Sequence, residues 1–257
     1  MPEARGENRP SDAGPGRVGI VFVSHSARLA EGLVELASQM APATRLIAAG
    51  GTADGGIGTS FDAVSAALRE ANTGRGVVVL CDLGSAILIA ATARDFLDDD
   101  EREGVYIVDA PLVEGGVAAA VAAEGGADRL GVVAAAESAR TSWTAPAVSA
   151  ESGKSPTKAV MTAPVEAAPD IRYARTVTLI NVSGLHARPA AEFVRLANTF
   201  PAKVTVNGKD AKSLLSIMGL ALVAGATAEI VSADASGQEA VDALADLVES
   251  GFGEERA

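Results

Sequence analysis

Residues 139–172 have the composition of a linker rather than of a folded core, and this predicts that the chain is divided into two parts. The segment is rich in Ala, Pro, Ser, Thr and Lys, has prolines at positions 146, 156, 164 and 169, and keeps no hydrophobic period. Such a composition is typical of a flexible linker. The sequence therefore predicts two folded domains, residues 17–138 and 173–257, and a disordered, Pro- and Gly-rich terminus over residues 1–16.

Strand and helix signals alternate through the first of these domains. The expected strands are Val18–Ser24, Arg45–Ala49, Gly76–Cys81 and Val105–Val108, and the expected helices are Ala27–Met40, Phe61–Asn72, Ile87–Leu97 and Val113–Glu124. This order predicts an α/β domain in which a parallel sheet has helices on both sides.

The second domain has a different order of signals. Strands are expected at Thr176–Ile180, Lys203–Val206 and Ala228–Ser232, and helices at Arg188–Asn198, Ser213–Leu222 and Gln238–Ser250. Asn207-Gly208 is a strong signal for a hairpin turn. The pattern predicts an α+β open-faced sandwich, an antiparallel sheet with helices on one face.

Bulk properties exclude several kinds of protein. A net charge of −12 argues against binding to nucleic acids or anionic membranes, which requires basic surface. The single cysteine, Cys81, excludes an internal disulfide framework and is expected to be buried. No apolar run is long enough to cross a membrane, and residues 1–16 lack the apolar core of a signal peptide, so we expect a soluble, cytoplasmic protein. No cluster of metal ligands is present, and we expect neither a metal nor a cofactor on this chain.

The chain has two histidines, and each lies between a strand-like run and a helix-like run. Imidazole combines nucleophilicity at neutral pH with reversible protonation. A helix N-terminus favours anions such as phosphate. The placement of His25 and His186 therefore indicates two phosphate carriers that act in sequence.

His186 is expected where the chain enters a helix, with Arg188 and Pro189 in the first turn. Free N–H groups at that end favour an anion, and a guanidinium can hold phosphate oxygens. These residues predict a minimal phosphate-accepting site, because phosphoryl transfer mainly requires positioning and charge stabilisation. Spacing alone also allows a histidine that caps the helix beside a surface arginine.

The segment Gly184–Ala190, with sequence GLHARPA, and the later segment Ala211–Leu214 resemble HPr, the histidine phosphocarrier of the bacterial phosphoenolpyruvate:sugar phosphotransferase system (PTS). The resemblance spans about residues 173–250. It implies that His186 accepts phosphate from enzyme I on Nδ1 and that Arg188 steadies it. Ser213 aligns with a serine that some HPr proteins phosphorylate for regulation. Its alternative role is the N-cap of the following helix.

His25 follows the first expected strand, at the edge of the sheet where open α/β folds place their sites. The glycine-rich loop 50–59 leaves the same edge, and its backbone N–H groups can approach an anion. Asp82 directly follows a buried strand. It is placed to accept a hydrogen bond from one ring nitrogen and leave the other free, or else to cap the helix that starts near Ser85.

Five segments of this domain resemble the DhaM family, the phosphotransfer subunits of PTS-dependent dihydroxyacetone kinases, whose N-terminal domain has the mannose-type IIA fold. The segments are Val23–Ser26, Ala48–Gly50, Gly56–Thr59, Asp82–Ala86 and Ala110–Gly115. The resemblance implies that His25 carries phosphate on Nε2, oriented by Asp82 and close to Ser85, and that this domain forms a homodimer. Mannose-type sugar transporters instead typically have Gly-Thr-His-Gly around the histidine.

The two resemblances together imply a relay. Phosphate would pass from phosphoenolpyruvate and enzyme I to His186, then to His25, then to ADP bound on the DhaL subunit, and the DhaK subunit would transfer it to dihydroxyacetone. Because the chain stops at Ala257, we expect a separate enzyme I. A linker of this length spans ~30–35 Å, so His186 could reach His25 of its own chain or of a dimer partner. A carrier that feeds a mannose-family PTS permease and a regulatory phosphoprotein are the alternatives.

Overall fold

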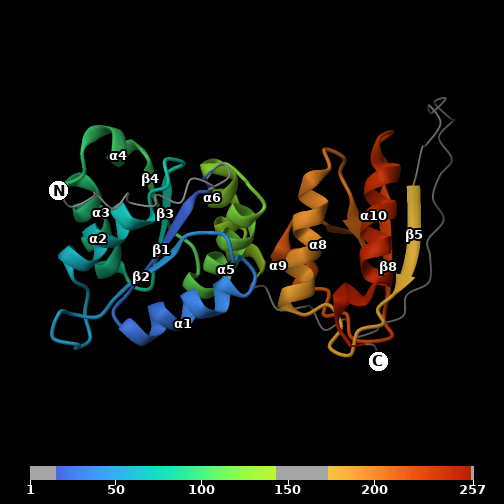
Figure 1. Cartoon of the computed structure of the whole chain (residues 1–257), viewed down its shortest axis with the longest axis horizontal. Coiled ribbons are helices and arrows are strands. Elements are labelled where there is room, and N and C mark those ends of the chain that lie inside the picture. The colour runs from blue at the N-terminus through green and yellow to red at the C-terminus, as the bar shows by residue number, and fades with distance from the viewer. Residues whose placement is uncertain (1–15, 143–172, 256–257) are drawn as a thin grey trace, which may run out of the picture.

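The computed structural model describes residues 16–142 and 173–255, which form two domains of different architecture (Figure 1). The N-terminal domain is built on a parallel sheet in the order β2-β1-β3-β4. Its strands are β1 (Gly19–Ser24), β2 (Leu46–Gly50), β3 (Val77–Cys81) and β4 (Val105–Val108). The predicted parallel sheet is confirmed.

Helices cover both faces of this sheet, as predicted. One face packs against α1 (Ala27–Ser38), α5 (Leu112–Glu124) and α6 (Arg129–Glu137), and the other against α2 (Phe61–Ala71) and α3 (Gly84–Asp95). Successive residues of β3 point to opposite faces, because side chains alternate along a strand. Val78 and Leu80 join the first core, whereas Val77 and Val79 join the second. Cys81 is buried at the end of this strand.

The N-terminal domain contains three helices that the sequence pattern did not predict. They are α4 (Asp99–Glu103), α6 and the short α7 (Ala139–Ser142). Helix α7 occupies the first four positions of the predicted linker, and there Ala139 is buried and Arg140 pairs with Asp109 at 2.7 Å. These contacts place the end of the domain later than the expected boundary at residue 138. The rest of the expected linker, and residues 1–15 of the expected disordered terminus, lie outside the described residues.

The second domain is an open-faced sandwich, as predicted. Its antiparallel sheet has the order β5-β8-β6-β7, with strands β5 (Tyr173–Thr178), β6 (Thr205–Val206), β7 (Lys209–Asp210) and β8 (Thr227–Ser232). Its helices are α8 (Ala187–Thr199), α9 (Leu214–Met218) and α10 (Gly237–Glu249), and a 3-10 turn, η1 (Gly251–Gly253), follows. Along β8, Ala228 and Ile230 are buried whereas Thr227 and Glu229 are exposed. One face of the sheet is therefore covered and the other is open.

Two local details in this domain follow from backbone conformation. The predicted hairpin turn is present, and Asn207 and Gly208 have φ values of 47° and 77°, the positive values that a two-residue turn of this type requires. Helix α9 ends at Met218 rather than at the predicted Leu222. Ala221 just beyond it has a φ of 46°, which is incompatible with a continuing right-handed helix.

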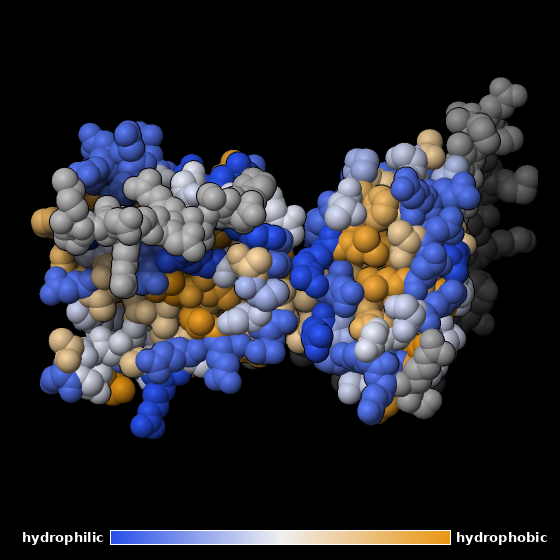
Figure 2. Space-filling model, in the orientation of Figure 1, coloured by the Kyte–Doolittle hydropathy of each residue, from blue (hydrophilic) through white to orange (hydrophobic). Residues whose placement is uncertain are grey.

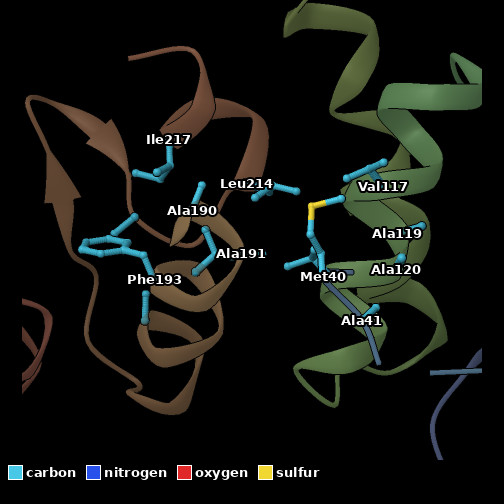
Figure 3. Packing of buried hydrophobic residues seen from close by; sticks show 14 of the residues in the cluster. Met40, Ala41, Val117, Ala119, Ala120, Ala190, Ala191, Phe193, Leu214 and Ile217 are labelled. Carbon is cyan, nitrogen blue, oxygen red and sulfur yellow. The ribbon is translucent and has the colours of Figure 1, made fainter. Parts of the chain in front are cut away.

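The domains touch through helices α5, α8 and α9. Figure 2 shows two lobes joined across a narrow waist. In Figure 3, Leu214 of α9 faces Met40 and Val117 of the N-terminal domain, and all three side chains are buried. Beside this contact, α5, α6, α8 and residues 212–214 line a cleft of about 420 Å³. Among the helices described, none is both long and apolar enough to cross a bilayer.

Candidate functional site

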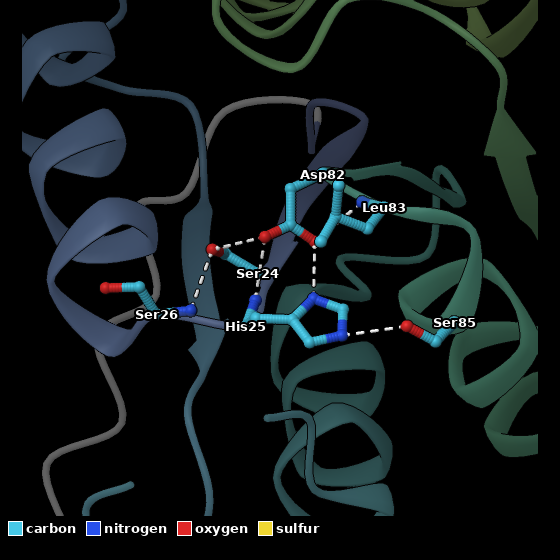
Figure 4. Close-up of polar contacts among 6 residues, drawn as sticks. All are labelled: Ser24, His25, Ser26, Asp82, Leu83 and Ser85. Carbon is cyan, nitrogen blue, oxygen red and sulfur yellow. Dashed lines mark hydrogen bonds and ion pairs between the residues drawn. The ribbon is translucent and has the colours of Figure 1, made fainter. Parts of the chain in front are cut away.

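His25 and Asp82 are brought together by neighbouring strands. Strand β1 pairs with β3 so that Val23 lies beside Cys81. The next residues of both strands therefore emerge at the same edge of the sheet, its carboxyl edge. The predicted meeting of His25 and Asp82 is present in the structure, and Ser85 joins them from the first turn of α3 (Figure 4).

The carboxylate of Asp82 accepts four hydrogen bonds. Its Oδ2 receives the Ser24 hydroxyl at 2.9 Å and the His25 backbone N–H at 2.8 Å. Its Oδ1 lies 3.0 Å from His25 Nδ1 and receives the Leu83 N–H at 2.7 Å. Burial opposes ionisation of this group, but the hydrogen bonds from His25, Ser24 and Leu83 outweigh it and hold the pKa of Asp82 below its ordinary value.

An ionised carboxylate can only accept hydrogen bonds, so the proton of the neutral His25 ring is on Nδ1. Its Nε2 then has a free lone pair, which accepts the Ser85 hydroxyl at 2.8 Å. The ring is 20% exposed, so Nε2 is accessible. Asp82 does not cap α3, because the N-cap of that helix is Leu83 and the cap makes no side-chain hydrogen bond to the helix. Asp82 therefore contacts the ring and the backbone of His25.

The glycine-rich loop supports the backbone around His25. The Gly58 N–H donates to the His25 carbonyl at 2.9 Å, and the Gly51 N–H donates to the Ser24 carbonyl at 3.2 Å. A Cβ at Gly50 would lie 2.7 Å from the Ser26 carbonyl oxygen, so only glycine allows the loop to approach so closely. These two N–H groups are engaged by the protein, which differs from the predicted approach of loop N–H groups to an anion.

His186 occupies the N-cap position of α8, but its side chain does not cap the helix. Instead, its Nε2 lies 3.0 Å from Oε1 and 3.2 Å from Oε2 of Glu254. Arg188 is exposed in the first turn of α8, and within residues 16–142 and 173–255 no hydrogen bond or ion pair engages its guanidinium. His186 is therefore the N-cap of α8 by position, but its ring contacts Glu254 instead of the helix N–H groups. The arrangement combines an exposed imidazole, an available guanidinium and a helix N-terminus.

Sequence reasoning missed two residues at this second site. Glu254 is 68 positions from His186, and its carboxylate also receives the Asn181 side-chain N–H at 2.9 Å. Burial opposes its ionisation, but the hydrogen bonds from Asn181 and His186 and the nearby charges of His186 and Arg188 lower the pKa of Glu254. No spacing signal connects residues so far apart, so only the fold reveals the contact.

The structure does not bring all the predicted residues together. The His25 set and the His186 set lie in different domains, and no hydrogen bond or ion pair between described residues joins them. Ser213 belongs to neither set, because its hydroxyl caps α9 by accepting the Ser216 N–H at 3.3 Å. Over the same described ranges, no three His, Cys, Asp or Glu side chains gather as a metal site would require.

Comparisons with known proteins match both domains. The family model of the PTS system fructose IIA component matches residues 19–132, and that of the PTS HPr component phosphorylation site matches residues 173–250. The phosphoryl donor subunit DhaM of the PEP-dependent dihydroxyacetone kinase from Providencia stuartii is 34% identical over 92% of this chain and 50% of its own length. The corresponding protein from Pantoea ananatis is 36% identical, over 92% of this chain and 51% of its own length. The chain thus spans about half the length of these two relatives.

A shorter relative is covered more completely. The phosphoryl donor subunit DhaM of PEP-dependent dihydroxyacetone kinase 2 from Listeria innocua is 42% identical over 40% of this chain and 84% of its own length. The two matched domains, the order in which they occur and these identities agree with one another. The chain therefore belongs to the DhaM family of phosphoryl donor subunits of PEP-dependent dihydroxyacetone kinases.

Proposed function

We propose that this chain relays phosphate from phosphoenolpyruvate and enzyme I, through His186 and then His25, to ADP bound on a DhaL subunit. A DhaK subunit then transfers the phosphate to dihydroxyacetone. The observation that carries the proposal is the geometry at His25. Asp82 holds one ring nitrogen, and the other has a free lone pair beside the Ser85 hydroxyl at the start of α3.

In the transfer to His25, the lone pair of Nε2 attacks the phosphorus on His186. The bond between phosphorus and Nδ1 of His186 breaks, and a bond to Nε2 of His25 forms. The proton on Nδ1 of His25 stays in its hydrogen bond to Asp82 throughout, and the carboxylate stabilises the positive charge that develops on the ring. The hydroxyl of Ser85 is placed to donate to a phosphate oxygen.

In the next transfer, an oxygen of the β-phosphate of ADP attacks the phosphorus on His25. The N–P bond breaks, the new P–O bond forms ATP on DhaL, and the electron pair returns to Nε2. Ser85 and the N-terminus of α3 face the phosphate in both steps, and positioning with charge stabilisation is what phosphoryl transfer mainly requires. The proposal also includes a homodimer through the N-terminal domain, which light scattering of the purified chain tests.

A coupled assay tests this function. The chain is mixed with enzyme I, phosphoenolpyruvate and the DhaK and DhaL subunits loaded with ADP, and formation of dihydroxyacetone phosphate is followed. We expect no product with His25→Ala, and none with His186→Ala when no separate HPr is added. Phosphate on both histidines without product would reject the kinase role and favour a permease-feeding carrier or a regulatory phosphoprotein.

A further inference from the structure

We propose that Glu254 is a positioning residue of the second phosphate carrier, which holds Nε2 of His186 so that Nδ1 is the nitrogen left free to accept phosphate. This inference rests on the proposed function of His186. It goes further because it assigns a role to a carboxylate that lies outside the segment carrying the histidine.

The contact between these two side chains is well defined. Both carboxylate oxygens of Glu254 lie within hydrogen-bond distance of Nε2, at 3.0 and 3.2 Å. The side chain of Glu254 is 24% exposed and that of His186 is 41% exposed. The ring is therefore fixed at one nitrogen by a sheltered acceptor while its other nitrogen stays accessible.

Glu254 is itself held in place. Asn181, which is fully buried, donates one N–H to Glu254 Oε2 at 2.9 Å and the other to the Gly184 carbonyl at 2.7 Å. The Val182 N–H also donates to the Glu255 carbonyl at 3.1 Å. Because Asn181 bonds both the carboxylate and the loop that leads to His186, it fixes the distance between them. The side-chain oxygen of Asn181 is buried and has no hydrogen-bond partner among the described residues, so the amide contributes here through its two donated bonds.

The charge of this carboxylate matters for the chemistry. An ionised Glu254 accepts the Nε2–H, so the lone pair of the neutral ring is on Nδ1. When Nδ1 takes up a phosphoryl group, the proton remains on Nε2 and the ring becomes positively charged. The carboxylate offsets that charge while the bond to phosphorus forms, and the guanidinium of Arg188 is available to the phosphate oxygens.

In both carriers, a carboxylate therefore holds one ring nitrogen and leaves the other free, but the nitrogen that is held differs. Asp82 holds Nδ1 of His25, which leaves Nε2 free, and Glu254 holds Nε2 of His186, which leaves Nδ1 free. In each case the carboxylate is fixed by further hydrogen bonds from the protein. A protein that transfers phosphate to His186 thus meets a ring whose Nδ1 is free. A protein that takes phosphate from His25 meets a ring whose Nε2 carries it.

The test compares Glu254→Gln with Glu255→Gln in the full chain. Both variants remove one negative charge, but the side chain of Glu255 is exposed and forms no contact with His186. Histidine labelled with ¹⁵N gives only two ring systems, which His25→Ala assigns. In Glu254→Gln we expect the Nε2 proton of His186 to exchange with water about tenfold faster, because its charged acceptor is lost. We also expect phosphorylation of His186 by enzyme I to slow about tenfold, whereas Glu255→Gln behaves as the wild type.

The outcomes separate the two proposals. An Nδ1–H tautomer of His186 in the wild-type chain, or a Glu254→Gln variant that keeps the wild-type exchange and phosphorylation rates, would overturn the role of Glu254. The tautomer and the proton exchange of the His186 ring are measured without phosphate, so their result does not depend on whether enzyme I phosphorylates this residue. A wild-type chain that enzyme I never phosphorylates on His186 would instead reject the proposed function. Backbone spectra of each variant show that it is folded.

Discussion

At the scale of single residues, each histidine ring is held at one nitrogen by one carboxylate, His25 by Asp82 and His186 by Glu254. Asp82 follows a buried strand, and carboxyl ends of neighbouring parallel strands meet at one edge, so the sequence alone placed it near His25. Glu254 lies beyond the last helix, in a turn where Phe252 has a φ of 56°. No hydrophobic period predicts such a turn, so the position of Glu254 depends on how the residues after α10 pack against the rest of the domain.

Asp82→Asn tests the orientation of His25. The amide can donate to the ring as well as accept from it, so the tautomer with Nε2 free is no longer enforced. We expect phosphate transfer through His25 to fall about a hundredfold or more, as expected when a carboxylate that orients a catalytic imidazole is replaced by an amide. Phosphorylation of His186 by enzyme I is the internal control, and an unchanged rate of product formation would contradict the assigned role.

The same substitution, Asp82→Asn, also tests how the free energy of unfolding depends on pH. The pKa of Asp82 is lowered in the folded chain from an ordinary value of 3.8. Its ionised form therefore stabilises the fold above that value, and this contribution is lost as the pH falls through the lowered pKa. Urea unfolding should show that Asp82→Asn reduces the free energy of unfolding at neutral pH and that the difference shrinks at pH values below 3.8. A difference that stays constant would show that ionisation of Asp82 does not stabilise the fold.

At the scale of helices and strands, the apolar runs in the sequence predicted both sheets but did not predict every helix. Helix α6 was missed because Gly131 interrupts a short pattern that two further glycines, Gly125 and Gly126, precede. It is helical because Val132, Val133 and Ala136 are buried in the core of the N-terminal domain. Packing of this kind overrides local propensity, which is a weak signal.

The loop that delivers His186 to α8 depends on one glycine. Gly184 has a φ of 62°, and a Cβ there would lie 2.3 Å from the Leu222 carbonyl oxygen. Gly208 has a similar φ of 77° but open space around it. Gly208→Ala should therefore cost only the conformational strain, about 1–2 kcal/mol. Gly184→Ala should lower the free energy of unfolding by at least about 2 kcal/mol more, because the loop must move.

Urea unfolding of the two variants measures this difference. Gly184→Ala should also slow phosphorylation of His186, because the loop holds the ring through the hydrogen bonds that Gly184 makes with Asn181 and His186. Gly208→Ala should leave that rate unchanged. Equal losses of stability in the two variants would show that the loop absorbs the extra methyl group.

At the scale of the whole molecule, the contact between the domains lies away from His25. His25 precedes α1 and Met40 follows it, and a 12-residue helix is about 18 Å long. Met40 lies in the contact whereas His25 lies at the other end of the helix. On α8, the cleft is lined by Val194 and Asn198 rather than by the turn next to His186. The composition of residues 139–172 predicted two domains, but it contains no information on how they dock.

We therefore expect direct transfer from His186 to His25 within one chain to require this contact to open. Met40→Glu should open it, because the charge would be buried without a partner against Val117 and Leu214. The matched control is Leu36→Glu, a half-exposed position on α1, the helix that precedes Met40. We expect X-ray scattering to show a larger radius of gyration for Met40→Glu only. Phosphate transfer to His25 should then become several-fold faster, because a larger fraction of the chains is competent for transfer. Separated domains with unchanged transfer would show that the docked arrangement does not limit the relay, as expected if phosphate passes between chains.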